Sequence, residues 1–180
     1  CNPTRLGFVK ILKKMNAKIK IVKLKKKYGE LVGNLICESS PNLKPINCSK
    51  KLVPLAIDEF PLLFVLSSLI KGKSKWNGIA ELRTKESDRI KTMEVGLNKV
   101  GIRTKSTKDS LTIIGKPNLQ IKKTLHIFPY NDHRIAMAFF CLKQLVNGKI
   151  LIHNFECVKT SFPKFLMTMK KIGAKYELQK

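Results

Sequence analysis

Two short stretches of the chain combine arginine, lysine and carboxylate side chains just before an apolar-periodic segment. Residues 82–90 read Leu-Arg-Thr-Lys-Glu-Ser-Asp-Arg-Ile, and residues 131–138 read Asn-Asp-His-Arg-Ile-Ala-Met-Ala. Lys and Arg together number 36, but only five of them are Arg, and three of these five lie in the two stretches. A guanidinium is a planar, permanently charged fork that binds carboxylate or phosphate with paired hydrogen bonds. The pattern therefore predicts helix ends that face an anionic ligand.

The first stretch could gather three charged side chains at one place. Residues three or four apart share a helix face, so a helix beginning near Lys85 would direct Lys85, Glu86 and Arg89 into one pocket. A carboxylate placed among cations is suited to exchange a proton with a bound anionic substrate. The alternative is an ordinary capped surface helix that carries charge pairs, and this stretch alone leaves both interpretations open.

Two further aspartates precede predicted helices. Asp132 could be only a cap of the helix that follows it, with His133 and Arg134 in solvent, or these residues could face an anionic ligand. Asp58 precedes an almost wholly apolar helix, where it could be another cap or a base toward a substrate hydroxyl. The sequence contains no Gly-rich phosphate loop and no Ser/His/Asp or Cys/His nucleophile pattern.

The net charge of +24 admits nucleic acid, an anionic membrane or anionic small molecules as partners. The lysines occur in every segment, and aromatic residues are not interleaved with them as a base-stacking surface would require. We therefore expect no specific nucleic-acid binding, with codon bias and anionic substrates explaining the charge. The longest apolar stretch, residues 61–70, is shorter than the roughly 18 residues of a membrane span, so no membrane partner is expected.

The cysteines and histidines do not form a recognisable metal site. Five scattered cysteines include no Cys-x-x-Cys pair, and the three histidines share no metal-ligand spacing. This pattern favours reduced thiols in a cytosol-like compartment and argues against a metal cofactor.

Internal repeats indicate the fold. Residues 3–19, 86–104 and 161–176 each predict an amphipathic helix that ends at Asn or Gly and is followed by an alternating strand. Residues 57–73 and 131–149 each predict an Asp-capped apolar helix that ends at Gly and leads to a strand, at 74–77 and 150–153. The other predicted strands are residues 20–24, 31–37, 110–114 and 125–128, and residues 42–51 are expected to form a loop. The chain is thus predicted to contain about two and a half similar α/β units.

The two charged stretches closely resemble signature stretches of the 5-enolpyruvylshikimate-3-phosphate synthase family. Residues 2–7 (Asn-Pro-Thr-Arg-Leu-Gly), 57–61 (Ile-Asp-Glu-Phe-Pro) and 160–163 (Thr-Ser-Phe-Pro) match the same family in order. The resemblance implies an α/β fold of repeated βαβαββ units, the enolpyruvyl transferase fold. Residues 1–180 would form most of the carboxy-terminal domain of a two-domain enzyme whose first domain is missing. A start at Cys1 rather than at Met also predicts a fragment or a processed piece.

The resemblance further implies the activity of 3-phosphoshikimate 1-carboxyvinyltransferase. Such an enzyme transfers the enolpyruvyl group of phosphoenolpyruvate to the 5-hydroxyl of 3-phosphoshikimate and releases phosphate, without a metal or organic cofactor. This is a step of the shikimate pathway toward chorismate and the aromatic amino acids. The full-length enzyme is expected to be cytoplasmic and monomeric.

The same resemblance assigns roles by motif. Asp58 would accept the proton of the shikimate hydroxyl, Lys85 would bind 3-phosphoshikimate, and Glu86 would handle the proton at the phosphoenolpyruvate methylene. Arg89 and Arg134 would bind phosphoenolpyruvate, and His133 would line that side of the site.

The sequence departs from the family pattern in two respects. Thr160 stands where many members have a phosphoenolpyruvate-binding Lys, and Lys159 lies one residue earlier. Nothing in the chain matches the substrate-binding residues of the first domain, so the 180-residue chain alone should bind substrates weakly and turn over negligibly. The alternatives are a basic nucleic-acid-binding module and a non-catalytic remnant, although joint retention of Asp58, Glu86, Arg89 and Arg134 speaks against decay.

Overall fold

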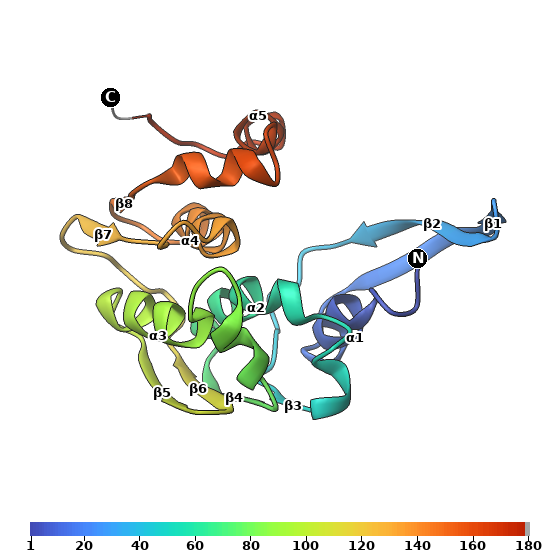
Figure 1. Cartoon of the computed structure of the whole chain (residues 1–180), viewed down its shortest axis with the longest axis horizontal. Coiled ribbons are helices and arrows are strands. Elements are labelled where there is room, and N and C mark those ends of the chain that lie inside the picture. Colours follow the sequence, from blue (N-terminus) through green and yellow to red (C-terminus); the bar gives the residue numbers. More distant parts are fainter. Residues whose placement is uncertain (179–180) are drawn as a thin grey trace.

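The structure is a computed structural model in which residues 1–178 are described, and it contains three small sheets (Figure 1). Strands β1 (Ile19–Lys27) and β2 (Glu30–Cys37) form an antiparallel hairpin. A four-stranded sheet has the order β3-β4-β6-β5, and β7 and β8 form a parallel pair. The bounds of these six strands are β3 (Asn47–Cys48), β4 (Gly72–Asn77), β5 (Arg103–Thr107), β6 (Ser110–Gly115), β7 (Leu125–Ile127) and β8 (Ile150–Ile152).

One βαβαββ unit is complete and lies in the middle of the chain. It runs from β3 through helix α2 (Phe60–Ser68), β4 and helix α3 (Arg89–Lys99) to β5 and β6. β3 and β4 are parallel, and β6 lies between β4 and β5 and is antiparallel to both. This topology confirms the predicted α/β fold of repeated units.

The flanking parts of the chain repeat portions of this unit. Helix α1 (Gly7–Lys14) followed by β1 and β2 corresponds to the last three elements, α3, β5 and β6. The run β7, α4 (His133–Leu145), β8 and α5 (Phe165–Lys171) corresponds to the first four, with the same parallel pairing of its two strands. The described chain therefore holds half a unit, a whole unit and most of a third.

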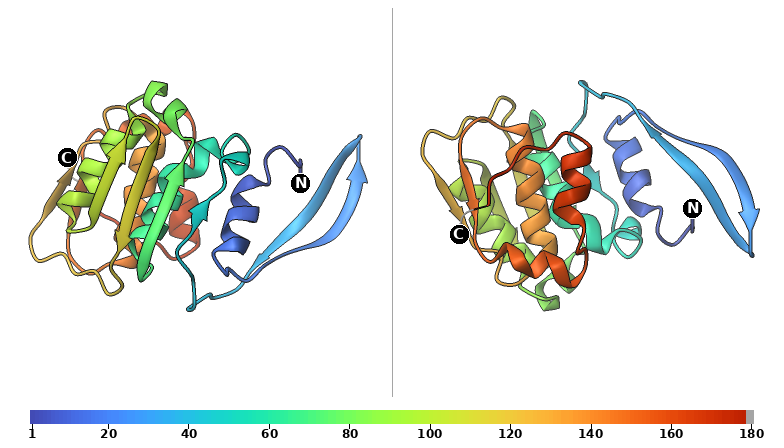
Figure 2. Two further views of the ribbon diagram at one scale, coloured as in Figure 1. Left: turned by 90° about the horizontal axis from the view of Figure 1, so that it is seen from below. Right: turned by 90° about the horizontal axis from the view of Figure 1, so that it is seen from above.

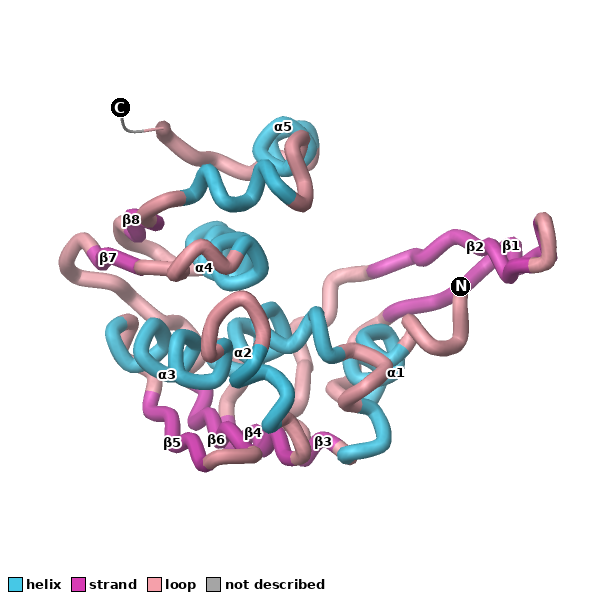
Figure 3. The backbone as a smooth tube through the Cα atoms, viewed as in Figure 1, coloured by secondary structure: helices cyan, strands magenta, loops and turns pink. Residues whose placement is uncertain are grey.

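Helices α2, α3 and α4 stack above one face of the four-stranded sheet (Figures 2 and 3). Helix α2 is apolar on all sides because it packs against the sheet, α3 and α4 at once. Its Phe60 and Phe64 meet Trp76 of β4 edge to face, with ring centroids 5.4 and 5.7 Å apart. A β-carbon on Gly96 of α3 would lie 2.2 Å from the Phe139 ring of α4, so this glycine permits the close contact of the two helices.

Three predictions about elements need correction. Helix α3 begins at Arg89, not near Lys85, because the Asp88 side chain accepts a hydrogen bond from the Lys91 N–H and caps the helix there. Asp58 is not a helix cap, since it lies in a 3-10 turn, Ile57–Glu59, that leads directly into α2. The predicted loop at residues 42–51 contains β3 and the start of the 3-10 turn Lys50–Leu52.

The strand predicted after the last helix is not formed in residues 174–178. The backbone N–H and carbonyl of Lys175 are instead bonded to the side-chain amide of Gln144 on α4. A strand forms only where a neighbour completes its hydrogen bonds, and here a side chain takes that place. Within residues 1–178, no helix combines the length and apolar character that a membrane span requires.

Candidate active site

Asp132 fixes the start of α4 and connects it to α3. Its side chain is fully buried and accepts hydrogen bonds from the backbone N–H groups of Arg134 and Ile135, at 3.0 and 3.3 Å, which confirms the predicted cap. Its other carboxylate oxygen accepts from Arg89 Nε at 2.8 Å and from Ser87 Oγ at 3.1 Å. The amino-terminal ends of α3 and α4 are therefore held together by one carboxylate.

The guanidinium of Arg89 is fully buried among three carboxylates. In addition to the bond from Nε to Asp132, its Nη2 donates to Glu86 Oε2 at 2.5 Å. Its Nη1 lies 3.6 Å from Asp58 Oδ1 and has no hydrogen-bond partner within residues 1–178. Because a buried donor without a partner is costly, this nitrogen would gain from an oxyanion placed against it.

Asp58 lies among three guanidinium groups from three separate segments. Its carboxylate oxygens are 3.4 Å from Arg134 Nη2, 3.6 Å from Arg89 Nη1 and 3.8 Å from Arg5 Nη1. The carbonyl oxygen of Asp58 accepts from Arg134 Nη1 at 3.2 Å. These charge contacts are longer than a strong hydrogen bond, and the side chain is 28% exposed, so the carboxylate retains capacity to accept a hydrogen bond from a ligand.

Glu86 and His133 adjoin this group. The Glu86 carboxylate is partly exposed, and its Oε1 lies 4.0 Å from Nδ1 of the mostly buried His133. The structure therefore brings together Asp58, Glu86, Arg89, His133 and Arg134, which the sequence singled out. Arg5 joins them although no role was predicted for it, and its one signal in the sequence was its place in the matched motif at residues 2–7.

Two cations of the first charged stretch do not join the group. Lys85 precedes α3 in an extended conformation, so the helical spacing assumed for it does not apply, and its ammonium pairs with Glu81. Arg83 donates to Asp88 at 2.6 Å and to the carbonyls of Lys108 and Thr107. It therefore connects the start of α3 to the β5–β6 turn rather than facing a ligand. Lys159 pairs with Glu156.

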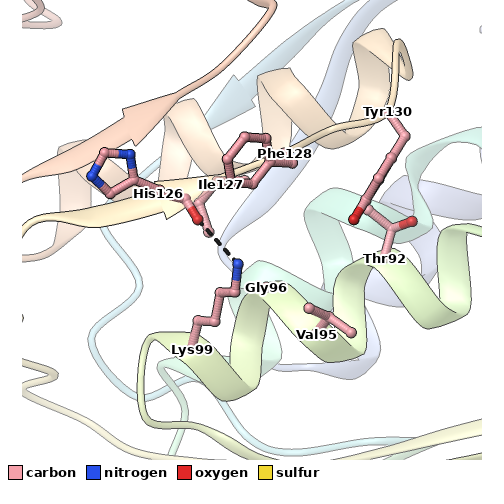
Figure 4. Close-up of a pocket in the computed structure, with 8 residues that line it drawn as sticks. All are labelled: Thr92, Val95, Gly96, Lys99, His126, Ile127, Phe128 and Tyr130. Atoms are coloured by element: carbon pink, nitrogen blue, oxygen red, sulfur yellow. Dashed lines mark hydrogen bonds between the residues drawn. The ribbon is translucent and has the colours of Figure 1, made fainter.

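Two hollows of the described structure lie elsewhere. A groove of about 880 Å³ runs beside β8 and is lined by α4, α5 and residues 175–178. A hollow of only about 10 Å³ lies between α3 and β7 with the residues that follow it, where Lys99 donates to the carbonyl of His126 (Figure 4). The charged group lines neither of these two hollows.

Comparison with known proteins first defines the class of protein. The chain has the enolpyruvyl transferase fold: it superposes on the enolpyruvyl transferase NikO from Streptomyces tendae with a TM-score of 0.68 and 16% identity, over 95% of this chain and 36% of that one. It superposes more closely on the EPSP synthase from Acinetobacter baumannii, with a TM-score of 0.93 and 39% identity over 99% of this chain and 41% of that one.

The chain belongs to the EPSP synthase (3-phosphoshikimate 1-carboxyvinyltransferase) family, whose model matches residues 1–169. It is 39% identical to the 3-phosphoshikimate 1-carboxyvinyltransferase of Halorhodospira halophila over 98% of its own length. It is 41% identical to the protein of the same name from Petrotoga mobilis over 95% of its length. In both cases it spans only 39% of the length of the relative.

Proposed function

We propose that the chain takes part in transferring the enolpyruvyl group of phosphoenolpyruvate to the 5-hydroxyl of 3-phosphoshikimate, with release of phosphate. One observation carries the proposal. Asp58, Glu86, Arg89 and Arg134 belong to one connected group of charges although contacts within it span 43 and 76 residues of sequence. Family membership favours this function over a nucleic-acid-binding module.

In the proposed mechanism, Asp58 accepts the proton of the 5-hydroxyl, and the hydroxyl oxygen then bonds to C2 of phosphoenolpyruvate. Glu86 delivers a proton to the methylene carbon in this addition. In the elimination, Glu86 takes back a proton from the resulting methyl group, the double bond forms again, and the C2–O bond to phosphate breaks. The proton held by Asp58 leaves with the released phosphate. Arg89 Nη2 donates a hydrogen bond to Glu86, and Arg89 Nη1 remains to donate to the substrate anion.

The cationic side chains would stabilise charge as it develops. Arg134 and Arg89 would bind the oxyanions of phosphoenolpyruvate, with His133 beside them, and fixed charges of this kind usually give the largest catalytic effect. Lys85 would bind 3-phosphoshikimate only after leaving its partner Glu81. The free thiols of all five cysteines fit the proposed location in the cytoplasm.

We also propose that residues 1–180 are most of the second domain of a larger, monomeric enzyme whose first domain supplies the opposite wall of the site. The comparison of equivalent strands supports this. Leu111 and Ile113 of β6 are fully buried in the complete unit, whereas Leu31 and Leu35, which share one face of the equivalent β2, are 40% and 54% exposed. Exposed apolar side chains in a row indicate a surface that another part of a protein covers.

Fragment complementation tests both proposals. The chain is mixed with the remainder of the Halorhodospira halophila relative, made separately without the matched segment, and phosphate release from both substrates is followed. We expect negligible turnover from either part alone and clear turnover from the mixture, whereas a mixture with Asp58→Asn should stay near background. Ordinary turnover by the chain alone would contradict the shared site, and an inactive mixture would contradict the assigned reaction. Duplex-DNA binding that survives moderate salt would favour the nucleic-acid alternative.

A further inference from the structure

The motif Asn-Pro-Thr-Arg-Leu-Gly at residues 2–7 has no part in the function proposed above, yet its geometry is specific. Asn2 Oδ1 accepts hydrogen bonds from the Thr4 N–H at 2.9 Å and from Thr4 Oγ1 at 2.7 Å. The Arg5 N–H donates to the Asn2 carbonyl at 3.0 Å. Asparagine is well suited to such a turn because its side chain bonds to the backbone two residues later. The turn fixes the backbone from which Arg5 extends.

Gly7 places this turn directly against the segment that carries Asp58. It is the first residue of α1, and a β-carbon built on it would lie 2.4 Å from the Leu55 carbonyl oxygen. Only glycine allows this approach, because any side chain would overlap the Leu55 backbone. Helix α1 lies beside the segment leading into α2 (Figure 1). This contact holds the half unit at the start of the chain against the segment that carries Asp58.

Arg5 differs from the other two arginines that surround Asp58. Arg89 is fully buried, with Nε and Nη2 bonded to carboxylates, and Arg134 also bonds to the Asp58 backbone. The Arg5 side chain is 72% exposed, and its Nη1 lies 3.8 Å from Asp58 Oδ2. An exposed ion pair at this distance adds little to stability. Its guanidinium is therefore free to bind an arriving anion at small cost, while remaining next to Asp58.

We propose that Arg5 is a further substrate-binding residue, whose guanidinium binds an oxyanion group of the same substrate whose hydroxyl Asp58 deprotonates. The inference rests on the function proposed above and extends it to 3-phosphoshikimate, which carries a carboxylate and a phosphate. The planar guanidinium of Arg5 offers several hydrogen-bond donors to such a group. It approaches Asp58 from a different segment of the chain than Arg89 and Arg134 do. Asn2 and Gly7 then act as positioning residues that hold the Arg5 turn in place.

Steady-state kinetics of the complemented enzyme test this inference. Arg5→Gln should raise KM for 3-phosphoshikimate about tenfold, the loss of one charge-assisted hydrogen bond, while kcat and KM for phosphoenolpyruvate change by less than about twofold. Arg5→Lys, which keeps the charge but loses the fork, should give an intermediate KM. Arg103→Gln on β5 is the matched control, because Arg103 is also exposed but makes no side-chain contact with the charged group in the described structure, and it should leave both KM values unchanged.

The outcomes separate the two proposals. Unchanged KM values for Arg5→Gln in an active mixture would overturn the inference and leave the proposed function intact, as would a rise confined to KM for phosphoenolpyruvate. Calorimetric titration of the unmixed 180-residue chain with 3-phosphoshikimate gives a second readout that does not depend on turnover. Equal affinity of the unchanged chain and Arg5→Gln in that titration would also overturn the inference. Thermal unfolding of both variants should match the unchanged chain, because the exposed pair contributes little to stability.

Discussion

The Arg89 guanidinium and the Asp132 carboxylate are both fully buried and are joined by a 2.8 Å hydrogen bond from Nε to Oδ2. Asp132 is at the same time the cap of α4, and Arg89 is the first residue of α3. A buried charge is tolerated only while its partner remains, so each residue depends on the other. The pair thus connects helix packing directly to the candidate active site.

Removal of the Arg89 charge should strongly destabilise the chain. Arg89→Met leaves Asp132 buried without its cation, and we expect the free energy of unfolding to fall by about 3–5 kcal/mol. Arg134→Met is the comparison, since Arg134 is partly exposed and its loss should cost about 1 kcal/mol or less. Urea denaturation followed by circular dichroism measures both, and equal losses would show that Arg89 has no special structural role.

The two proposed proton-transfer residues should be needed for turnover but not for folding. Asp58→Asn and Glu86→Gln in the complemented enzyme should each lower kcat by about 10²–10⁴-fold, the usual contribution of a positioned acid or base. Glu156→Gln is the control, because Glu156 is exposed, pairs with Lys159 and lies outside the charged group. Near-normal rates in both site variants would remove these carboxylates from the mechanism.

The cysteines should differ widely in reactivity. Burial raises the pKa of Cys48 to about 11, and burial also raises the pKa of Cys141 and Cys157. Because the thiolate is the reactive form, only about one Cys48 in a thousand would be ionised at pH 8. Iodoacetamide labelling followed by mass spectrometry should find the exposed Cys37 modified first and Cys48 last, with Cys48 labelling faster as the pH rises toward 10. Equal labelling of Cys37 and Cys48 at pH 8 would contradict the burial of Cys48.

The contact of α3 with α4 should not tolerate a methyl group at residue 96. Gly96→Ala would force the buried Phe139 ring to move, and overpacking of this kind should cost about 1–3 kcal/mol in unfolding free energy. If the ring is the obstacle, Phe139→Leu in the Gly96→Ala background should recover part of the loss. Thermal denaturation of the single and double variants checks this, and an unaffected Gly96→Ala protein would refute the close contact.

The sequence allowed prediction of the units but not of every element boundary. Helices α2 and α4 could be located because each is a run of mostly apolar residues that begins after an Asp and ends before a Gly. The start of α3 was placed too early because several residues in the stretch before it could cap a helix, and packing selects Asp88. The strand expected at residues 174–178 failed because strand formation needs a partner, which local patterning does not reveal.

Prediction of the site was limited by the same dependence on distant partners. Arg83 and Arg89 stand in one stretch and look alike in sequence. Arg83 bonds to carbonyls 24 and 25 residues away, whereas Arg89 bonds to a carboxylate 43 residues away. Spacing within a helix cannot distinguish these outcomes, because the tertiary fold supplies both sets of partners. For the same reason the sequence did not predict a role for Arg5, because its spatial neighbour Asp58 lies far along the chain.

The complete βαβαββ unit lies between two incomplete ones, and this arrangement has a consequence for the order in which the chain unfolds. β4 and β6 have neighbouring strands on both sides, whereas within the described residues β1 and β2 pair with no other strand. Amide protons of β4 and β6 should therefore exchange with deuterated solvent last, and those of the hairpin first. On warming, the hairpin should melt as an early, separate event, so a single melting temperature would describe only the central part of the chain.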